Sequence, residues 1–199
     1  MSKEVWKPGT LLSPVPVVMV SCGDMKKSNI ITVAWTGIVN TNPAMVYISV
    51  RPQRYSHKII SETKEFVINL VTRELVKKTD QCGVYTGAKM DKFKKFALTP
   101  EKASKISAPL IKESPVNIEC KVEQIISLGT HDMFLARVEA VNVDEALIDS
   151  NGKLDLKKSK LIAYSHGDYL ELGKKVGTFG YSVKKKKVSK IITDIRINY

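Results

Sequence analysis

Short runs of apolar residues alternate with polar turns along most of the chain. The runs have the length and the β-branched content that are typical of strands. They cover Val15–Cys22, Asn29–Gly37, Ala44–Val50, Glu65–Val71, Val116–Ile126 and Met133–Asp144. From Val116 to Val122 apolar and polar residues alternate strictly, and the turn SLGTHD leads directly into the next run. These last two runs are therefore predicted to form an antiparallel hairpin.

Between the strands, apolar residues at helical spacing predict a few short helices. Ser56–Thr63 is one, with Ser56 as its N-cap, and Arg73–Gly83 is another that ends at the glycine. Ala88–Phe96 is the third. Regular alternation of strand and helix is missing, which argues against a doubly wound parallel sheet. The pattern predicts a mainly β fold, an antiparallel barrel with helices packed outside.

The length of 199 residues suits one domain, and 43% hydrophobic residues with a mean hydropathy of −0.11 are typical of a globular protein. No apolar run approaches the roughly 18 residues of a membrane helix. The N-terminus has no apolar signal core, so we expect a cytoplasmic protein that does not bind a membrane. The three cysteines have neither metal nor disulfide spacing, and no metal site is predicted.

The net charge is 32 − 20 = +12, which suits nucleic acid or an acidic protein partner. Much of the lysine is local, above all in the run Lys184–Lys187. No aromatic platform or nucleic-acid motif accompanies these lysines. A solvated basic surface is therefore favoured over a nucleic-acid-binding module, which is kept as an alternative.

In the second strand run, Thr32, Ala34 and Thr36 share one face, while Ile31, Val33 and Trp35 share the other. A flat ligand can approach the first face closely because its side chains are small. The same pattern also suits small-residue packing inside a barrel.

Two arginines follow the third strand run, in the segment RPQRYSHKII. Arg51 and Arg54 have the geometry to grip a phosphate, and Ser56 at a helix start adds a hydroxyl and free amides. A polar loop with an N-cap explains the same residues equally well. The sequence holds no glycine-rich phosphate loop, so the two readings remain open.

Three further features carry candidate chemistry. His131 lies in the turn between two strand runs, where it would either line a pocket or face solvent. Cys82 has no partner motif for a reactive thiol. Residues 159–183 hold closely spaced glycines and tyrosines, which suit either a close approach to a ligand or a meander that closes the barrel.

Taken in order, these segments resemble the flavin reductase-like family, within it the flavoredoxin branch. The resemblance rests on NIITVAWTGIVNTNPAMVYISVRPQRYSHKIISETKEFVINLV, DKFKKF, LGTHDMFLARVEAV and LIAYSHGDYLELGKKVGTFGYSV, in family order over about residues 12–183. It implies one domain over residues 1–199, a split barrel with a basic tail at 184–199. It also implies a homodimer that binds FMN near the subunit interface.

By the same resemblance, particular residues would surround the flavin. Its ring and ribityl chain would be bordered by Asn29, Thr32, Val33, Ala34 and Trp35, and its phosphate end by Ser49, Val50, Arg51, Arg54, Tyr55 and Ser56. Asn69 and Leu70 would lie near the ring. Lys92 and Phe93 of DKF would reach a flavin in the facing subunit. His131 would lie beside the ring, although Gly129-Thr130-His131 replaces the family's Gly-Asp-His.

The function implied is an FMN-dependent oxidoreductase, because a flavin carries its own redox chemistry and needs no acid–base dyad. The sequence has no Gly-x-Gly-x-x-Gly fingerprint, so NADH or NADPH would bind transiently over the exposed ring. An electron carrier with tightly bound FMN and no pyridine-nucleotide activity is the alternative. The positive charge would also steer an acidic redox partner.

Overall fold

The computed structural model describes residues 1–183, and the tail at 184–199 with its Lys184–Lys187 run lies outside the described residues. Its main feature is an antiparallel seven-stranded sheet in the order β3-β2-β6-β9-β10-β5-β4. The strands of this sheet are β2 (Val18–Gly23), β3 (Ser28–Val33), β4 (Thr36–Thr41), β5 (Ala44–Val50), β6 (Glu65–Leu70), β9 (Val116–Ser127) and β10 (Asp132–Val143). The predicted hairpin is β9–β10, and its register pairs Asp132 with Ser127.

The sheet closes on itself because β3 and β4, its two edges, are neighbours along the chain. Only Ala34 and Trp35 separate them, and the amide of Ser49 in β5 donates to the carbonyl oxygen of Trp35 at 2.8 Å. The chain itself joins the two edges at this bend, which lies against β5 and which we call the seam. The predicted single strand Asn29–Gly37 was wrong in this detail, since the chain bends at the seam and becomes two strands. The prediction of a mainly β fold with an antiparallel barrel is confirmed.

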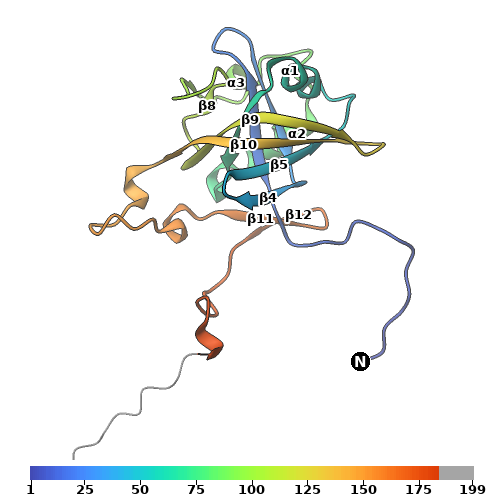
Figure 1. Ribbon diagram of the computed structural model, residues 1–199, viewed down its shortest axis with the longest axis vertical. Coiled ribbons are helices and arrows are strands. Elements are labelled where there is room, and N and C mark those ends of the chain that lie inside the picture. The colour runs from blue at the N-terminus through green and yellow to red at the C-terminus, as the bar shows by residue number, and fades with distance from the viewer. Residues whose placement is uncertain (184–199) are drawn as a thin grey trace, which may run out of the picture.

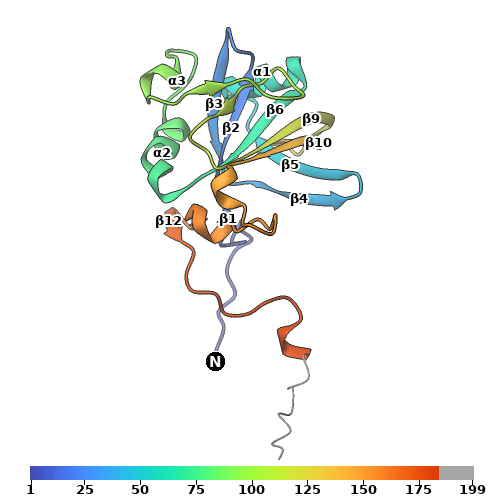
Figure 2. The same cartoon turned by 90° about the vertical axis from the view of Figure 1, so that its left-hand side faces the viewer.

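Two hydrophobic cores explain why β2 reads as an unbroken apolar run. Val18, Val20 and Cys22 point into the barrel, where Ile60 of α1 (Tyr55–Thr63) closes one side. Met19 points to the opposite side, into a second core. That core is covered by α2 (Val76–Val84) and α3 (Lys92–Lys95), so both faces of β2 are buried. Figure 2 shows the two helices on the outer side of β2 and β3.

Smaller elements complete the domain. β1 (Val15–Pro16) pairs with the hairpin of β11 (Ile162–Ser165) and β12 (Asp168–Glu171), and β7 (Pro100–Glu101) pairs with β8 (Leu110–Ile111). Short 3-10 turns cover Arg73–Leu75, Glu145–Leu147, Leu156–Ser159 and Tyr181–Val183. Figure 1 shows the β11–β12 hairpin under the barrel, with the first residues and the segment after β12 extending away from it.

The polar face of β9 is buried at its beginning. Asn117 and Glu119, which alternate with the apolar residues, are covered by the loops around residues 104–111. The Glu119 carboxylate accepts hydrogen bonds from the amides of Ser104 and Lys105. Buried polar groups must be hydrogen-bonded to be tolerated, and these groups are. The alternation of β9 therefore separates two buried faces here, rather than a core face from a solvated one.

Candidate functional site

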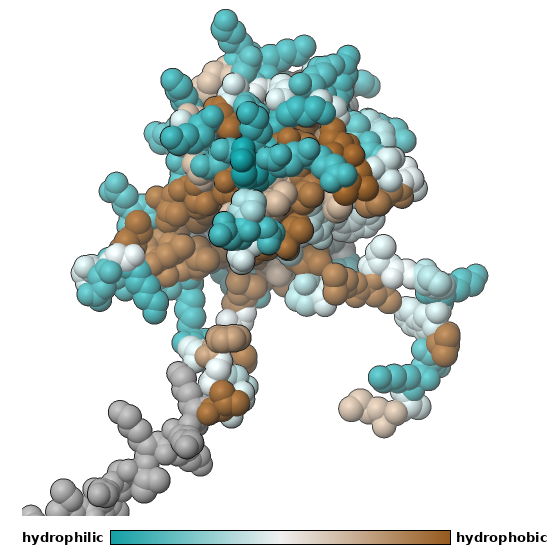
Figure 3. Space-filling model, viewed as in Figure 1, coloured by the Kyte–Doolittle hydropathy of each residue, from teal (hydrophilic) through white to brown (hydrophobic). Residues whose placement is uncertain are grey.

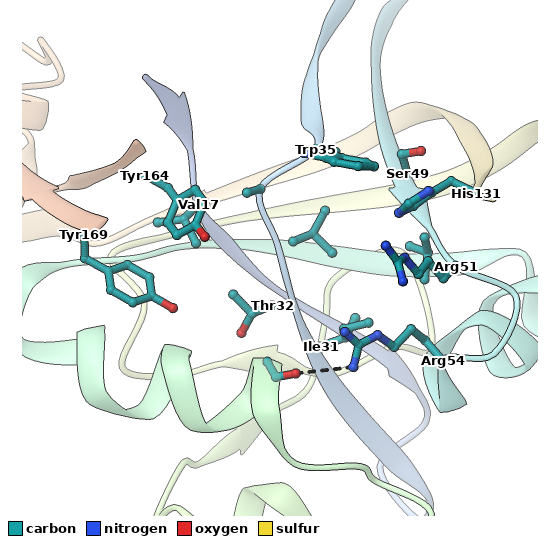
Figure 4. Close-up of a pocket in the computed structure, with 14 residues that line it drawn as sticks. Val17, Ile31, Thr32, Trp35, Ser49, Arg51, Arg54, His131, Tyr164 and Tyr169 are labelled. Atoms are coloured by element: carbon teal, nitrogen blue, oxygen red, sulfur yellow. Dashed lines mark hydrogen bonds between the residues drawn. The ribbon is translucent and has the colours of Figure 1, made fainter. Parts of the chain in front are cut away.

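A pocket of about 290 Å³ lies on the seam, and we call it the seam pocket. It is lined by Val17, Ile31, Thr32, Val33, Ala34, Trp35, Ser49, Val50, Arg51, Arg54, Gly83, His131, Tyr164 and Tyr169. Figure 4 shows Trp35, His131 and the arginines on one side of β3 and the two tyrosines on the other, with Thr32 between them. The bend at Ala34 and Trp35 opens this space, because ladder pairing stops where the chain changes from one sheet edge to the other.

Trp35 and His131 form the upper wall of the seam pocket. Their ring centroids are 4.4 Å apart with the planes tilted by 45°, and 43% of Trp35 is exposed. Nδ1 of His131 lies 3.0 Å from Oγ1 of Thr130. Burial lowers the pKa of His131, and the charges of Arg51 and Arg54 lower it further. His131 is therefore a neutral imidazole at pH 7, able to form a hydrogen bond but carrying no charge.

The arginines make the seam pocket positive. Both are exposed, and Nη1 of Arg54 donates a long hydrogen bond of 3.5 Å to the carbonyl oxygen of Gly83 at the end of α2. The Arg51 guanidinium points between His131 and β3 (Figure 4). No aspartate or glutamate of residues 1–183 lines this pocket. A cavity with two cations and no carboxylate attracts an anionic ligand.

A smaller pocket of about 130 Å³, the inner pocket, adjoins the seam pocket and shares Ile31, Arg54 and Gly83 with it. Its other lining residues are Asn29, Gln53, Tyr55, Ser56, Cys82, Tyr85, Thr86, Gly87 and Lys92. The first turn of α1 opens onto it. The N-cap of α1 is Arg54 and makes no side-chain capping bond, so the prediction of Ser56 as N-cap was wrong. Ser56 lies inside the first turn, and its Oγ accepts a 2.7 Å hydrogen bond from Nδ2 of Asn29.

Lys92 is the unusual residue of the inner pocket. Only 3% of it is exposed, and its Nζ donates to the carbonyl oxygens of Ile30 and Cys82, each at 2.7 Å. Within the described chain no carboxylate lies within ion-pair distance of this ammonium. Burial lowers the pKa of Lys92 to about 8, and the charge of Arg54 contributes in the same direction. The inner pocket thus holds a buried cation that lacks a counter-ion, next to a second cation and a helix N-terminus.

The opposite wall of the seam pocket comes from the C-terminal hairpin. Tyr164 of β11 and Tyr169 of β12 contact edge to face with centroids 5.5 Å apart. The Tyr169 hydroxyl lies 3.2 Å from Oδ1 of Asp80 in α2. Burial raises the pKa of Tyr169 to about 12, and the Asp80 carboxylate adds to this, so the phenol stays protonated. The pocket therefore has an aromatic wall at each end.

β3 forms the floor between these walls. Ile31 and Val33 point into the barrel core, while Thr32 faces α2 and its hydroxyl donates to the carbonyl oxygen of Thr79. The predicted small face of Thr32, Ala34 and Thr36 ends at the bend. Thr36 belongs to β4 and donates to the carbonyl oxygen of Tyr47 instead. The floor is therefore formed without Thr36. Its side chains are still small enough for a flat ring to lie against them.

Most of the predicted site residues do meet around these two pockets. The seam pocket includes Thr32, Val33, Ala34, Trp35, Ser49, Val50, Arg51, Arg54 and His131, and the inner pocket includes Asn29, Tyr55, Ser56 and Lys92. These residues come from two stretches, β3 with the bend after it and the junction of β5 with α1, and from two single positions farther along the chain, Lys92 and His131.

Asn69 and Leu70 are placed elsewhere. Asn69 is fully buried, and its amide nitrogen donates to the carbonyl oxygen of Met19 at 2.9 Å while its Oδ1 accepts from the amide of Ile111 at 3.0 Å. Neither residue lines the seam pocket or the inner pocket. In this structure Asn69 joins β2, β6 and β8 in the interior, and its place beside a ring stays a prediction.

Phe93 lines neither the seam pocket nor the inner pocket. It is buried in the second core, so its ring packs inside its own chain. Lys92 directs its ammonium into the inner pocket of its own chain as well. An anion in the inner pocket would therefore lie beside Lys92 of the same chain.

Sequence reasoning missed Val17, Ile31, Gly83, Tyr164 and Tyr169 as residues of the seam pocket. The clustered glycines and tyrosines of residues 159–183 were a signal for the tyrosines, but one that suited a meander equally well. The sequence also left His57 without a role. Its Nε2 lies 2.7 Å from Oδ2 of Asp132, beside the loop of residues 51–54 between β5 and α1, which we call the arginine loop.

The remaining candidate chemistry is weak. Cys22, Cys82 and Cys120 are free and buried, and burial raises the pKa of the Cys82 thiol to about 11. A protonated thiol is a poor nucleophile. In the described residues no group of three or more His, Cys, Asp or Glu could hold a metal ion. No helix of that part of the chain is long and apolar enough to cross a membrane.

Comparisons with known proteins agree with one another. Residues 11–172 match the model of the flavin reductase-like domain. An uncharacterised protein of Archaeoglobus fulgidus is 30% identical over 167 residues, which cover 84% of this chain and 93% of that protein. Flavoredoxin of Desulfovibrio vulgaris (Miyazaki F) superposes with a TM-score of 0.85 at 28% identity, over 92% of this chain and 100% of that one. Flavoredoxin from Methanosarcina acetivorans gives 0.83 at 27% identity, with the same shares covered.

Proposed function

The chain belongs to the flavin reductase-like family and has its split-barrel fold, and from this premise we propose that it is an FMN-dependent oxidoreductase. In this proposal FMN occupies the seam pocket with its ring and the inner pocket with its phosphate. Electrons enter from NAD(P)H or a protein donor and leave to an acceptor.

The observation that carries the proposal is the inner pocket. It holds the buried ammonium of Lys92 without a carboxylate, with Arg54 and the start of α1 beside it. A phosphate dianion would supply the missing negative charge, and the first-turn amides and the Ser56 hydroxyl would donate to its oxygens. A neutral ligand would leave the buried charge uncompensated.

The seam pocket supports the proposed position of the flavin ring. The side chains of Thr32 and Ala34 on its floor are small, so a flat ring can lie against them. Trp35 and Tyr164 offer aromatic surfaces at the two ends of the pocket. Bound FMN would supply the hydride and electron chemistry. The residues of this chain would bind it, orient it and exclude water, and Arg51 with neutral His131 would donate hydrogen bonds at the ring edge.

The electron donor is proposed to be NADH or NADPH, bound transiently over the exposed side of the ring beside His131. A second candidate function is an electron carrier without pyridine-nucleotide activity. It is favoured by Thr130, whose hydroxyl lies 3.0 Å from Nδ1 of His131 and so occupies that ring nitrogen. Anaerobic mixing with NADH and NADPH separates the two functions: rapid bleaching of bound flavin supports the reductase, and unchanged flavin absorbance supports the carrier.

A homodimer is part of the proposal. β4 is an edge of the sheet, and its Ile38 and Val39 are 83% and 53% exposed, close along the chain to Trp35. Val141 of β10 is exposed as well, and Figure 3 shows apolar surface across this face of the molecule. Light scattering of the wild-type protein and of Ile38→Glu tests this. The excess of positive charge supports an acidic redox protein as a further partner.

The experiment that tests the function is an absorbance spectrum of the purified protein, followed by titration with FMN. We expect a yellow protein, or a colourless one that binds added FMN. Arg54→Ala should weaken FMN binding about tenfold through the lost charge-assisted contact, while Arg137→Ala, an exposed arginine of β10, should not. A protein that neither contains flavin nor binds it, under any of these conditions, contradicts the proposal.

A further inference from the structure

A groove of about 380 Å³ lies at the end of the β11–β12 hairpin that is remote from its turn, and we call it the hairpin groove. Its lining between residues 156 and 175 consists of three leucines, four lysines, one glutamate and one glycine. The segment that follows β12 forms one side of it, where the chain leaves the barrel (Figure 1). None of the lining residues belongs to the seam pocket or the inner pocket, so the flavin leaves this groove unexplained.

The base of the hairpin groove is apolar and open to solvent. Leu156 and Leu172 are 42% and 63% exposed, and Leu161 is half-buried. Leu161 has a fixed position, because it forms an isolated β-bridge with Thr72. Exposed apolar side chains that gather in one groove of a rigid element are typical of a surface that binds another protein.

The acidic side chains beside the hairpin groove are already paired. Oε1 of Glu171 lies 2.9 Å from Nη1 of Arg73, and Oε1 of Glu74 lies 3.3 Å from Nζ of Lys160. Both pairs join the hairpin or the residue before it to the 3-10 turn Arg73–Leu75. These carboxylates therefore do not neutralise the other lysines of the groove.

Three lysines make the rim of the hairpin groove positive. Within residues 1–183 the ammonium groups of Lys157, Lys174 and Lys175 have no ion-pair partner. A basic rim around an apolar base complements an acidic protein surface that carries an apolar side chain. A second copy of this chain would be repelled, because its net charge is +12. Nucleic acid is disfavoured as well, since among the described residues no aromatic ring lines the groove for base stacking.

The hairpin connects this groove to the seam pocket. Tyr169 lines the seam pocket, and Glu171, two residues later in β12, lines the groove. On the other side of the hairpin, Tyr164 lines the pocket and Leu161 lines the groove. At about 3.3 Å per residue, the two sites are roughly 7–10 Å apart along the chain. A protein seated in the groove would therefore lie next to the wall of the proposed ring site.

We propose that the hairpin groove docks an acidic electron-transfer protein that donates electrons to the flavin. Its carboxylates would pair with Lys157, Lys174 and Lys175, and an apolar side chain would cover Leu156 and Leu172. Two reduced donor molecules would each lose one electron, and the flavin would gain both electrons together with one proton from solvent. This rests on the proposed flavin function and deepens it, because it names the class of donor and the surface on which it docks.

Calorimetric titration of the protein as purified with a [2Fe–2S] ferredoxin of low isoelectric point, an iron–sulfur electron carrier, tests the docking. In Lys157→Glu/Lys174→Glu the affinity for ferredoxin should fall about tenfold or more. The control Lys102→Glu/Lys112→Glu makes the same charge change at exposed positions outside the groove, and it should lose less than about threefold. Leu172→Ala keeps the charge and should lose about threefold, because an apolar contact is removed.

A second measurement follows the electrons. Reduced ferredoxin is mixed anaerobically with the FMN-loaded protein, and the bleaching of the flavin is recorded. At low ionic strength the Lys157/Lys174 variant should be reduced about tenfold more slowly than the Lys102/Lys112 control. Dithionite, a small reductant that needs no docking surface, should reduce both variants at the same rate.

Three results would overturn the inference. Ferredoxin may not bind the wild-type protein at all, or the groove variant and its control may lose affinity equally, which is a general charge effect. Vesicles containing phosphatidylserine that bind the wild type but not the groove variant, where ferredoxin binds neither, would assign the groove to a membrane surface. Groove-dependent binding of ferredoxin to a protein that takes up no FMN would refute the proposed function and leave the docking surface in place.

Discussion

Nε2 of His57 lies 2.7 Å from Oδ2 of Asp132, and this pair joins α1 to the first residue of β10. Asp132 is also the ladder partner of Val50, the residue that precedes Arg51. The arginine loop therefore leaves β5 beside one member of the pair and enters α1 beside the other. This arrangement fixes both ends of the loop that would hold the flavin phosphate.

Replacing Asp132 by Asn should loosen this loop. The substitution preserves shape but removes the charge, so we expect about 1 kcal/mol less unfolding free energy and severalfold weaker FMN binding. Calorimetry and flavin titration measure the two effects. Asp168→Asn, at an exposed position of β12, is the control and should change neither. Full FMN affinity in Asp132→Asn would show that the loop holds its shape without the pair.

The contribution of Asp132 should depend on pH in one direction. The hydrogen bond from His57 lowers the pKa of the Asp132 carboxyl in the folded protein. A lowered folded pKa stabilises the fold above the ordinary value of about 4, and this stabilisation disappears as the pH falls through the folded pKa. The stability difference between wild type and Asp132→Asn should therefore be full near neutral pH and shrink in acid. A difference that grows on acidification would contradict the assigned charge state.

Lys92 should couple flavin binding to proton uptake. Its pKa is about 8 in the unliganded protein, held down by burial, and among residues 1–183 the titratable neighbours that act on it are Cys82, Arg54 and Cys22. A phosphate dianion beside it would raise this pKa, so binding above pH 8 must take up a proton. The FMN affinity should therefore fall as pH rises from about 8 to about 9.5.

Riboflavin is the matched ligand for this test, because it has the same ring and no phosphate. Its affinity should show no such fall over the same range. Lys92→Met should bind FMN more weakly at pH 7 and lose the pH dependence. Calorimetry in two buffers of different ionisation enthalpy counts the protons directly. If FMN and riboflavin share one pH profile, Lys92 does not face the phosphate.

Asn69 should prove structural. Besides its bonds to Met19 and Ile111, its Oδ1 accepts from Nδ2 of Asn117 at 2.7 Å. Asn69→Ala leaves these buried groups without a partner, which should cost about 2–4 kcal/mol of unfolding free energy. The folded variant should bind FMN as the wild type does, and Asn151→Ala in an exposed turn should affect neither quantity. If Asn69→Ala lowers the FMN affinity without lowering the unfolding free energy, Asn69 contacts the flavin ring.

The hydrogen bonds of Asn69 show a limit of reasoning from the sequence. Its polar partners are Ser21, Ile111 and Asn117, which lie on separate elements far apart in the chain. A pattern read along one strand cannot show that residues of three other strands will meet its amide. The same limit hid Tyr164 and Tyr169, which reach the seam pocket only because β11 pairs with β1 below the barrel.

Other parts were predictable for local reasons. β9 and β10 alternate and are joined by a short turn, so their pairing follows from the sequence. Asn29 to Trp35 covers most of β3 and the bend after it, with the small residues Thr32 and Ala34. Ser49 to Ser56 covers the end of β5, the loop with the two arginines and the start of α1, and both stretches line the pockets. The break between β3 and β4 could not be predicted this way. It is caused by the meeting of two sheet edges, which is a property of the closed barrel rather than of either strand.

Trp35 should report on the ring directly. The chain has two tryptophans, Trp6 in the exposed N-terminal segment and Trp35 in the wall of the seam pocket. A flavin ring within contact distance of Trp35 would quench its fluorescence and stack on it, which is worth about 1 kcal/mol beyond burial. FMN should therefore quench most of the emission of Trp6→Phe, where Trp35 alone remains, and little of the emission of Trp35→Phe.

Trp35→Leu should weaken FMN and riboflavin binding equally, severalfold, because the contact is with the ring and not with the phosphate. If FMN still quenches the emission of Trp35→Phe, the ring lies away from the seam. The same follows if Trp35→Leu weakens the binding of FMN but not that of riboflavin.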